Sequence, residues 1–228
     1  MKLYPARRTN VSKGVSDIDT PILSSWQTMA SLSWWWPRGR IYTALIVPYD
    51  LELRPEKRYC LAMNQALLIV DVQNAFNPPP WLVSGLKRMT PHLMSVATVE
   101  RHDENKTPFH RQLGWAPPAD DECLLEVDHV FVKFGYAPSA ETIRFLKARK
   151  LDRVLVAGIQ TETCCLAAGF ALFDAGLSPT LLTDLTVGSS LDRSGQLGIK
   201  LWQHHFRNVT TSQEIMEEIG RQTAAGKP

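Results

Sequence analysis

The stretch that decides the fold is "RVLVAGIQTETCCLAAGFALFDAG", residues 153–176. After Arg153, residues 154–158 form a continuous apolar run, which is typical of a strand buried on both faces of a sheet. Residues 163–176 then have the composition of a buried helix, and Gly176 stands where a helix commonly ends in the left-handed conformation. The stretch therefore predicts one strand-to-helix unit of a parallel sheet.

The same alternation of strand and helix extends in both directions from this unit. Strands that alternate with helices imply right-handed crossovers and a mostly parallel sheet of about six strands, covered by helices on both faces. The carboxyl ends of such strands are where ligands bind. The predicted strands are 66–71, 95–100, 129–133, 153–158, 179–184 and 207–211, and the predicted helices are 79–94, 139–150, 163–176, 193–205 and 212–222, with a long polar loop over 102–123.

Residues 1–62 do not share this pattern. Five prolines interrupt them, their periodicity is weak, and they are net basic. The stretch containing Trp34, Trp35 and Trp36 is compatible with a partner-binding arm. We favour instead a poorly ordered N-terminal extension, or upstream sequence translated from a mis-called start, because regular alternation begins abruptly after Met63. The predicted organisation is an extension over 1–62 and a folded domain over 63–228.

The composition excludes several classes of function. The net charge of +2 over 228 residues does not indicate binding to nucleic acid, and no apolar run approaches the length needed to cross a bilayer. The first residues contain no apolar core of a secretory signal. The four cysteines have no spacing typical of a disulfide framework or a zinc site, so we expect a cytoplasmic protein with reduced thiols.

Three chemically capable residues stand at the ends of predicted strands. Asp71 ends the first strand, Lys133 ends the third, and Cys164 follows the fourth. Each has a plain structural alternative: a loop cap for Asp71, a solvated strand end for Lys133 and a small core residue for Cys164. Together they provide an acid, its cationic partner and a thiol at one edge of one sheet, which is what acyl transfer to a cysteine requires.

At this point the residues resemble a known family. The segments "ALLIVDVQNAF", "VFVKFGY", "VLVAGIQTETCCLAAGFALFDAG" and "TLLTDLTVGSS" are similar to the isochorismatase-like cysteine hydrolases, which include nicotinamidases and carbamoylsarcosine-type amidases. The resemblance runs from about residue 63 to the C-terminal helix. It implies a three-layer α/β/α Rossmann-like fold and a catalytic Asp–Lys–Cys triad.

Residue by residue, the resemblance places this triad on Asp71, Lys133 and Cys164. Cys165 stands where such proteins usually carry valine, so we interpret it as a packing residue. Cys164 also lies three residues after Thr161, a plausible N-cap. The positive end of the helix dipole would then lower the pKa of the Cys164 thiol and favour the thiolate.

The resemblance further implies how the developing oxyanion is held. The backbone N–H groups of Gln160 and Cys164 form the expected oxyanion hole, with a cis peptide bond between Ile159 and Gln160. No cofactor is expected. Association into homo-oligomers is common in such proteins, and the 62 positions from Asp71 to Lys133 leave only a short cap region, which suggests a pocket completed by a second copy.

The predicted function is hydrolysis of a C–N bond in a small-molecule amide, imide or ureido compound through a thioester. Two alternatives remain: a non-catalytic binding or assembly protein that keeps the fold, and vinyl ether hydrolysis of the isochorismatase type. The presence of Cys164 argues against the second, because the relatives with that chemistry lack the nucleophile. Candidate pocket walls are Phe76, Trp115 and Tyr136, and core packing is an equally good interpretation of each.

Nicotinamidase-like relatives hold a divalent metal through an aspartate and histidines in the loop after the second strand. This chain has His102, Asp103 and His110 in that loop, without the usual Asp-x-His order. We interpret them as a solvated polar loop and predict no metal.

A chain that begins at Met63 tests the predicted domain boundary. We expect it to fold and to keep the thermal transition of the full chain, because the regular alternation starts there. Circular dichroism melting curves of the two chains measure this. An insoluble truncated chain beside a soluble, monodisperse full chain would show that residues 1–62 are structural.

Overall fold

The protein is described by a computed structural model, which places residues 64–225. The predictions for residues 1–62, and for Met63 as the boundary, lie outside this described part. The described residues form a six-stranded sheet in the order β3-β2-β1-β4-β5-β6, and every adjacent pair of strands is parallel. The predicted fold class is confirmed. No helix among the described residues is long and apolar enough to cross a membrane.

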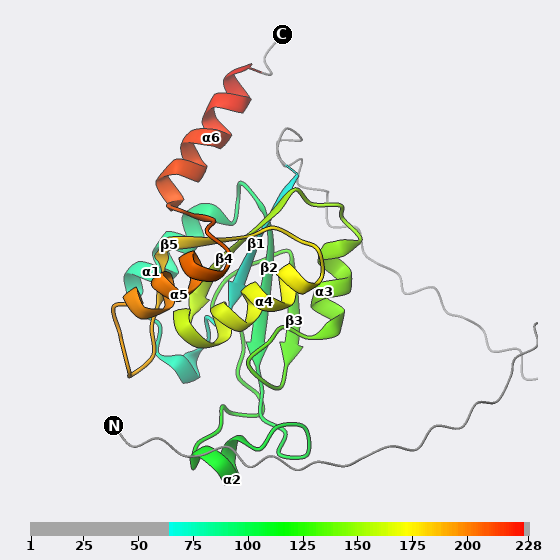
Figure 1. The fold of residues 1–228 in the computed structure, drawn as a ribbon, viewed down its shortest axis with the longest axis vertical. Helices are drawn as coiled ribbons and strands as arrows, with labels where there is room; N and C mark the ends of the chain where they lie inside the picture. The colour runs from blue at the N-terminus through cyan, green and yellow to red at the C-terminus, as the bar shows by residue number, and fades with distance from the viewer. Residues whose placement is uncertain (1–63, 226–228) are drawn as a thin grey trace, which may run out of the picture. The chain divides into compact units, whose positions relative to one another are not determined.

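The elements follow the predicted alternation closely (Figure 1). Each predicted strand is present, and so is each predicted helix, with boundaries that shift by a few residues. The strands are β1 (Gln65–Val70), β2 (Met94–Glu100), β3 (His129–Lys133), β4 (Arg153–Ile159), β5 (Pro179–Val187) and β6 (Val209–Thr210). The helices are α1 (Pro80–Met89), α2 (Phe109–Leu113), α3 (Ala140–Lys147), α4 (Leu166–Asp174), α5 (Gln196–His205) and α6 (Ser212–Ala225), with short turns η1 (Asn74–Phe76) and η2 (Thr161–Cys165).

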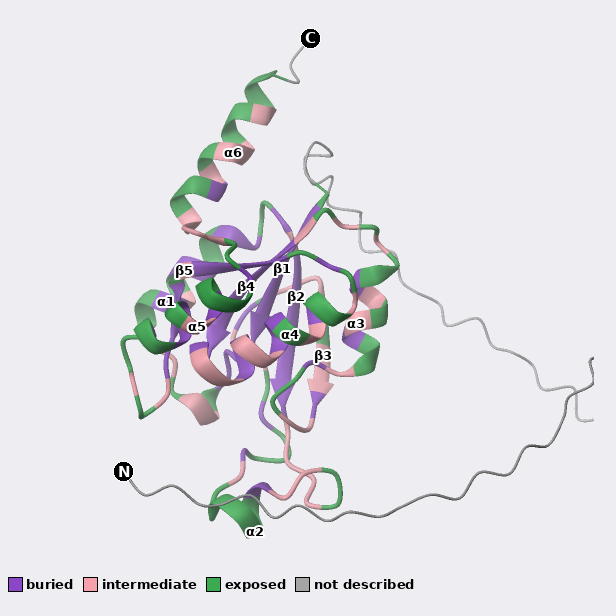
Figure 2. Ribbon diagram, in the orientation of Figure 1, coloured by how far each residue is buried: buried purple, intermediate pink, exposed green. Residues whose placement is uncertain are grey.

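Helices cover both faces of the sheet, so successive residues of each central strand enter two different cores. Leu68 and Val70 of β1 pack with α3, α4 and α5. Leu67 and Ile69 of the same strand pack on the opposite face, with α1 and α6. The central strands β1 and β4 are buried along their whole length except for Arg153, the first residue of β4 (Figure 2). This explains why their sequences are continuously apolar rather than alternating.

Local signals in the sequence explain where several elements begin and end. The Ser139 hydroxyl accepts a hydrogen bond from Thr142 N–H and caps α3, and Gly176 has a φ of 79° directly after α4. The loop predicted over 102–123 contains the short helix α2. Phe109 is its only buried residue, so the sequence shows no helical periodicity there.

The junction between β1 and β4 depends on a glycine. Gly158 lies opposite Val70 in the parallel register and has a φ of 120°. A Cβ atom at this position would lie 2.1 Å from the carbonyl oxygen of Val70. Only glycine therefore allows β4 to approach β1 directly before the turn that carries Cys164.

We predict that Gly158→Ala costs about 3 kcal/mol or more of the free energy of unfolding, since it combines an unfavourable φ with a backbone clash. Gly176→Ala is the matched control, because its φ is also positive but no atom lies within 4 Å of the new Cβ. That control should lose about 1 kcal/mol. Urea unfolding measures both, and equal losses would contradict the close-approach argument.

Candidate active site

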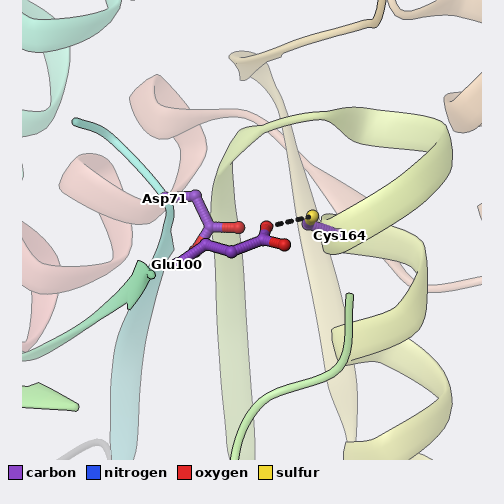
Figure 3. Close-up of side chains that lie close together, drawn as sticks. All are labelled: Asp71, Glu100 and Cys164. Carbon is purple, nitrogen blue, oxygen red and sulfur yellow. Dashed lines mark hydrogen bonds between the residues drawn. The ribbon is translucent and has the colours of Figure 1, made fainter. Parts of the chain in front are cut away.

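Four charged or nucleophilic side chains meet at the carboxyl ends of the four strands β3, β2, β1 and β4. Asp71 follows β1, Glu100 is the last residue of β2, Lys133 is the last residue of β3, and Cys164 lies in η2 after β4. Glu100 and Lys133 are direct partners in the parallel register. The three predicted residues Asp71, Lys133 and Cys164 are thus brought together, and Glu100 joins them. Figure 3 shows Asp71, Glu100 and Cys164 of this cluster.

The ammonium group of Lys133 lies at the centre of this cluster. Its Nζ is 2.8 Å from Asp71 Oδ2 and 2.8 Å from Glu100 Oε2, and it donates to the carbonyl oxygen of Gly135 at 2.7 Å. The three N–H donors of the lysine are directed to Glu100 Oε2, Gly135 O and Cys164 Sγ, and the contact with Asp71 is an ion pair. Cys164 Sγ lies 3.6 Å from the same nitrogen. Both ion pairs are almost completely excluded from solvent.

Thr98 fixes the position of Asp71. The Thr98 hydroxyl donates to Asp71 Oδ1 at 2.8 Å, and the Thr98 carbonyl accepts from the Asp71 N–H at 3.1 Å. Asp71 has a φ of 51°, in the left-handed region that aspartate tolerates better than most residues. Both oxygens of its carboxylate therefore have partners, one from β2 and one from Lys133.

Glu100 was missed by the sequence analysis, although it is held as firmly as the predicted residues. The side-chain amide of Gln73 brackets its backbone: Gln73 Nε2 donates to Glu100 O at 2.9 Å, and Glu100 N–H donates to Gln73 Oε1 at 2.8 Å. Gln73 in turn donates to Asp121 Oδ2 at 3.1 Å. The available signal was an acid at the end of a strand with no other charged residue, which runs between the strands of Asp71 and Lys133.

The electrostatics of the cluster follow from its burial. Burial, opposed by Lys133 and reinforced by Glu100, raises the pKa of Asp71 to about 6. Burial alone would lower the pKa of Lys133, but the charges of Asp71, Cys164 and Glu100 outweigh it and raise that pKa. Burial and Asp71 raise the pKa of the Cys164 thiol well above its ordinary value. The expectation that the helix terminus lowers this pKa was wrong, because desolvation of the thiolate dominates.

Cys164 is presented by a π-helical turn, η2, rather than by the first turn of an ordinary α-helix. The carbonyl of Gln160 accepts from both Thr163 N–H and Cys165 N–H. Gln160, not Thr161, is the N-cap residue, and the Thr161 hydroxyl instead forms a hydrogen bond with Thr186. The predicted cap was therefore wrong: the wider turn draws Thr161 into the helix. Such turns occur frequently at functional sites.

The two adjacent cysteines have different surroundings. Cys165 is fully buried and packs with Ala168 and Leu172 in the core beneath α4, as predicted. Its thiol lies 4.0 Å from the Thr186 hydroxyl, and burial raises its pKa. Cys164 Sγ instead donates to Glu100 Oε2 at 3.5 Å. The peptide bond between Ile159 and Gln160, just before this turn, is cis, as the family resemblance implied.

Each of the three predicted pocket residues takes part in an aromatic pair, and Phe109 joins them. The rings of Phe76 and Trp115 lie 5.8 Å apart, and those of Phe109 and Tyr136 lie 5.3 Å apart. The pKa of Tyr136 is raised first by burial and then by the negative charge at Cys164 and Glu100, so the charges of the cluster act on its hydroxyl. Trp115 and Tyr136 are about half exposed.

The described residues do not fit a metal ion. Asp71, Glu100 and Cys164 place ligand atoms within 4.8 Å of one another, but the Lys133 ammonium already lies against all three. Among residues 64–225, this is the one such group of possible ligands. His102 pairs with Glu104 at 3.0 Å and Asp103 pairs with Lys106, so the histidines after β2 do not converge.

A protein-family model described as the isochorismatase domain matches residues 65–214, more than half of the chain. The chain belongs to the isochorismatase family. The matched segment contains β1 to β6, and with them every residue of the cluster. No curated protein matches this isochorismatase-family chain by sequence.

Solved structures agree with the family at the level of the fold. A cysteine hydrolase from Pseudomonas syringae pv. phaseolicola 1448A is similar with a TM-score of 0.57 and 17% identity, over 70% of this chain and 93% of that one. A nicotinamidase/pyrazinamidase from Acinetobacter baumanii gives 0.56 and 20%, over 67% and 98%. A pyrazinamidase from Pyrococcus horikoshii, in complex with zinc, gives 0.56 and 18%, over 65% and 99%.

We predict that Lys133→Met costs about 3–5 kcal/mol of stability at pH 8, because it leaves two buried carboxylates without their cation. Lys133 lowers the pKa of Asp71, so its loss raises that pKa further above the unfolded value of 3.8. The folded variant then holds a proton that the unfolded chain releases, and its stability falls as the pH rises. Part of the loss should therefore be recovered at pH 5.

Urea unfolding at pH 5 and pH 8 measures this effect. Lys147→Met, on the exposed side of α3, is the matched control and should change stability by no more than about 0.5 kcal/mol at either pH. A Lys133→Met midpoint equal to that of the wild type at pH 8 would contradict the central role of the ammonium.

Proposed function

We propose that this isochorismatase-family chain is a cysteine-dependent hydrolase that cleaves a C–N bond of a small amide, imide or ureido compound through a thioester. The observation that carries the proposal is the contact of one buried ammonium, Lys133 Nζ, with the Asp71 carboxylate at 2.8 Å and the Cys164 thiol at 3.6 Å. These groups lie at the carboxyl edge of the sheet, where ligands of parallel α/β folds bind.

In the first step, Asp71 acts as the general base. The Cys164 thiol starts neutral, since burial raises its pKa, and it gives its proton to Asp71 as Sγ attacks the substrate carbonyl. A pKa of about 6 leaves Asp71 ionised at neutral pH and still basic enough to accept this proton. Lys133 holds Asp71 in place and compensates its charge.

The later steps use the same groups. The backbone N–H groups of Cys164 and Gln160 receive the oxyanion of the tetrahedral intermediate. The C–N bond breaks, the leaving nitrogen takes the proton from Asp71, and the acyl group remains on Sγ. Asp71 then deprotonates a water molecule that attacks the thioester, and the thiol takes the proton back when the C–S bond breaks.

The proposal includes the setting in which this chemistry takes place. A thiol nucleophile needs a reducing compartment, which favours the cytoplasm. Phe170 and Phe173 on α4 are exposed apolar side chains, and they are compatible with association into a homo-oligomer that completes the pocket. The substrate is a small molecule, as expected for a hydrolase of this family.

We predict that Cys164→Ala abolishes hydrolysis, whereas Cys165→Ala keeps most of it, because Cys165 only packs beneath α4. The measurement is ammonia release from a panel of small primary amides and ureido compounds by the purified full chain. Peptide mass spectrometry after stoichiometric iodoacetamide should find the label on Cys164. A label on Cys165 with Cys164 spared, or full activity of Cys164→Ala, would overturn the nucleophile assignment.

A further inference from the structure

Two buried carboxylate oxygens of the cluster accept no hydrogen bond, Asp71 Oδ2 and Glu100 Oε1, and of these only Asp71 Oδ2 has the Lys133 ammonium against it as an ion pair. Asp71 Oδ1 accepts from Thr98 and Asp71 Oδ2 pairs with Lys133. Glu100 Oε2 accepts from Lys133 and from the Cys164 thiol. Glu100 Oε1 has no partner among the described residues, although Glu100 is 98% buried, with 2% of its surface exposed. A buried carboxylate oxygen without a donor is costly unless something supplies one.

The unpartnered oxygen belongs to the carboxylate that contacts the reacting atom. It belongs to the same carboxylate as Oε2, which is 3.5 Å from Cys164 Sγ. Figure 3 shows the Glu100 side chain extending from the end of β2 toward the thiol. A nitrogen on the carbonyl carbon that Sγ attacks would therefore come within hydrogen-bond reach of Oε1.

We propose that Glu100 binds the substrate: its Oε1 accepts an N–H of the group that Cys164 attacks. The substrate class then narrows to uncharged compounds with a primary amide or ureido N–H at the scissile carbonyl. Esters and N,N-dialkyl amides lack this donor, and a carboxylate beside the scissile bond would meet the charge of Glu100. The inference rests on the proposed function of Cys164 as the nucleophile.

A purely structural role accounts poorly for Glu100. Asp71 alone neutralises the Lys133 ammonium. A second buried carboxylate leaves the cluster with an excess negative charge, which raises the pKa values of Asp71 and of the Cys164 thiol. Glu100 thus opposes formation of the thiolate. A hydrogen bond from Glu100 to the substrate would compensate this cost. The ion pair with Lys133 does not explain the presence of Glu100, because Asp71 already neutralises the ammonium.

Two alkylating probes test the hydrogen bond without a known substrate. Iodoacetamide carries an amide N–H on the carbonyl carbon next to the methylene carbon that Sγ attacks, and N,N-dimethyl-2-iodoacetamide lacks this N–H. Modification of Cys164 in the full chain is followed by peptide mass spectrometry, and each rate is divided by the rate of the same probe with glutathione. We expect wild-type Cys164 to prefer iodoacetamide by about tenfold or more, the effect of a hydrogen bond to a charged acceptor.

In Glu100→Gln, the ratio of the two normalised rates should fall to within about twofold of the value that means no preference beyond that of glutathione. Lys133 orients the oxygen of the new amide toward itself, so an NH₂ donor replaces the Oε1 acceptor. The loss of charge changes the reactivity of the thiol toward both probes and cancels in the ratio, as does any change in the folded fraction. Glu126→Gln, at an exposed position, is the matched control and should keep the wild-type preference.

The outcomes separate this inference from the function on which it rests. If wild type and Glu100→Gln have the same preference for iodoacetamide, the role of Glu100 is overturned and Cys164 remains the nucleophile. This result would mean either that the dimethyl probe is excluded sterically or that the thiol does not select between the probes. Failure of both probes to modify wild-type Cys164 overturns the proposed nucleophile itself. A preference lost in Glu100→Gln and kept in Glu126→Gln supports the assignment.

Discussion

The site depends on one buried ammonium group. Lys133 Nζ donates to Glu100 Oε2, to the Gly135 carbonyl and to Cys164 Sγ, and it forms an ion pair with Asp71 at 2.8 Å. Three acidic groups and one cation then share a space from which water is almost absent. Such an arrangement persists only when a cation contacts each of the acidic groups. The sheet supplies this condition by ending four adjacent strands at one place.

The order of the strands explains why β2 contributes to the site. Asp71 and Lys133 come from β1 and β3, which are not adjacent, and β2 lies between them. Residues two apart on β2 point to the same face, so Thr98 reaches Asp71 and Glu100 reaches Lys133. β2 therefore contacts both predicted partners, Asp71 through Thr98 and Lys133 through Glu100.

The fold and the three predicted residues follow from patterns that are local in the sequence. Apolar runs, the cap at Ser139 and the turn glycine Gly176 identify the elements, and parallel strands must present Asp71, Lys133 and Cys164 at one edge. The remaining features need the strand order or the backbone path. Glu100 becomes a site residue only once β2 lies between β1 and β3. The direction of the Cys164 pKa shift depends on how deeply the π-turn buries the thiol, which no sequence pattern specifies.

The central claim is that Asp71 and Lys133 act on Cys164 as one unit, and a double-mutant cycle tests it most directly. The values of kcat/KM for Asp71→Asn, Lys133→Ala and the double variant are compared on an amide that releases ammonia. Each single change should cost about 10²-fold or more. The double variant should be hardly worse than Asp71→Asn alone, since parts of one catalytic unit are strongly non-additive. Losses that add on a logarithmic scale, with Lys133→Ala near the wild type, would contradict the account.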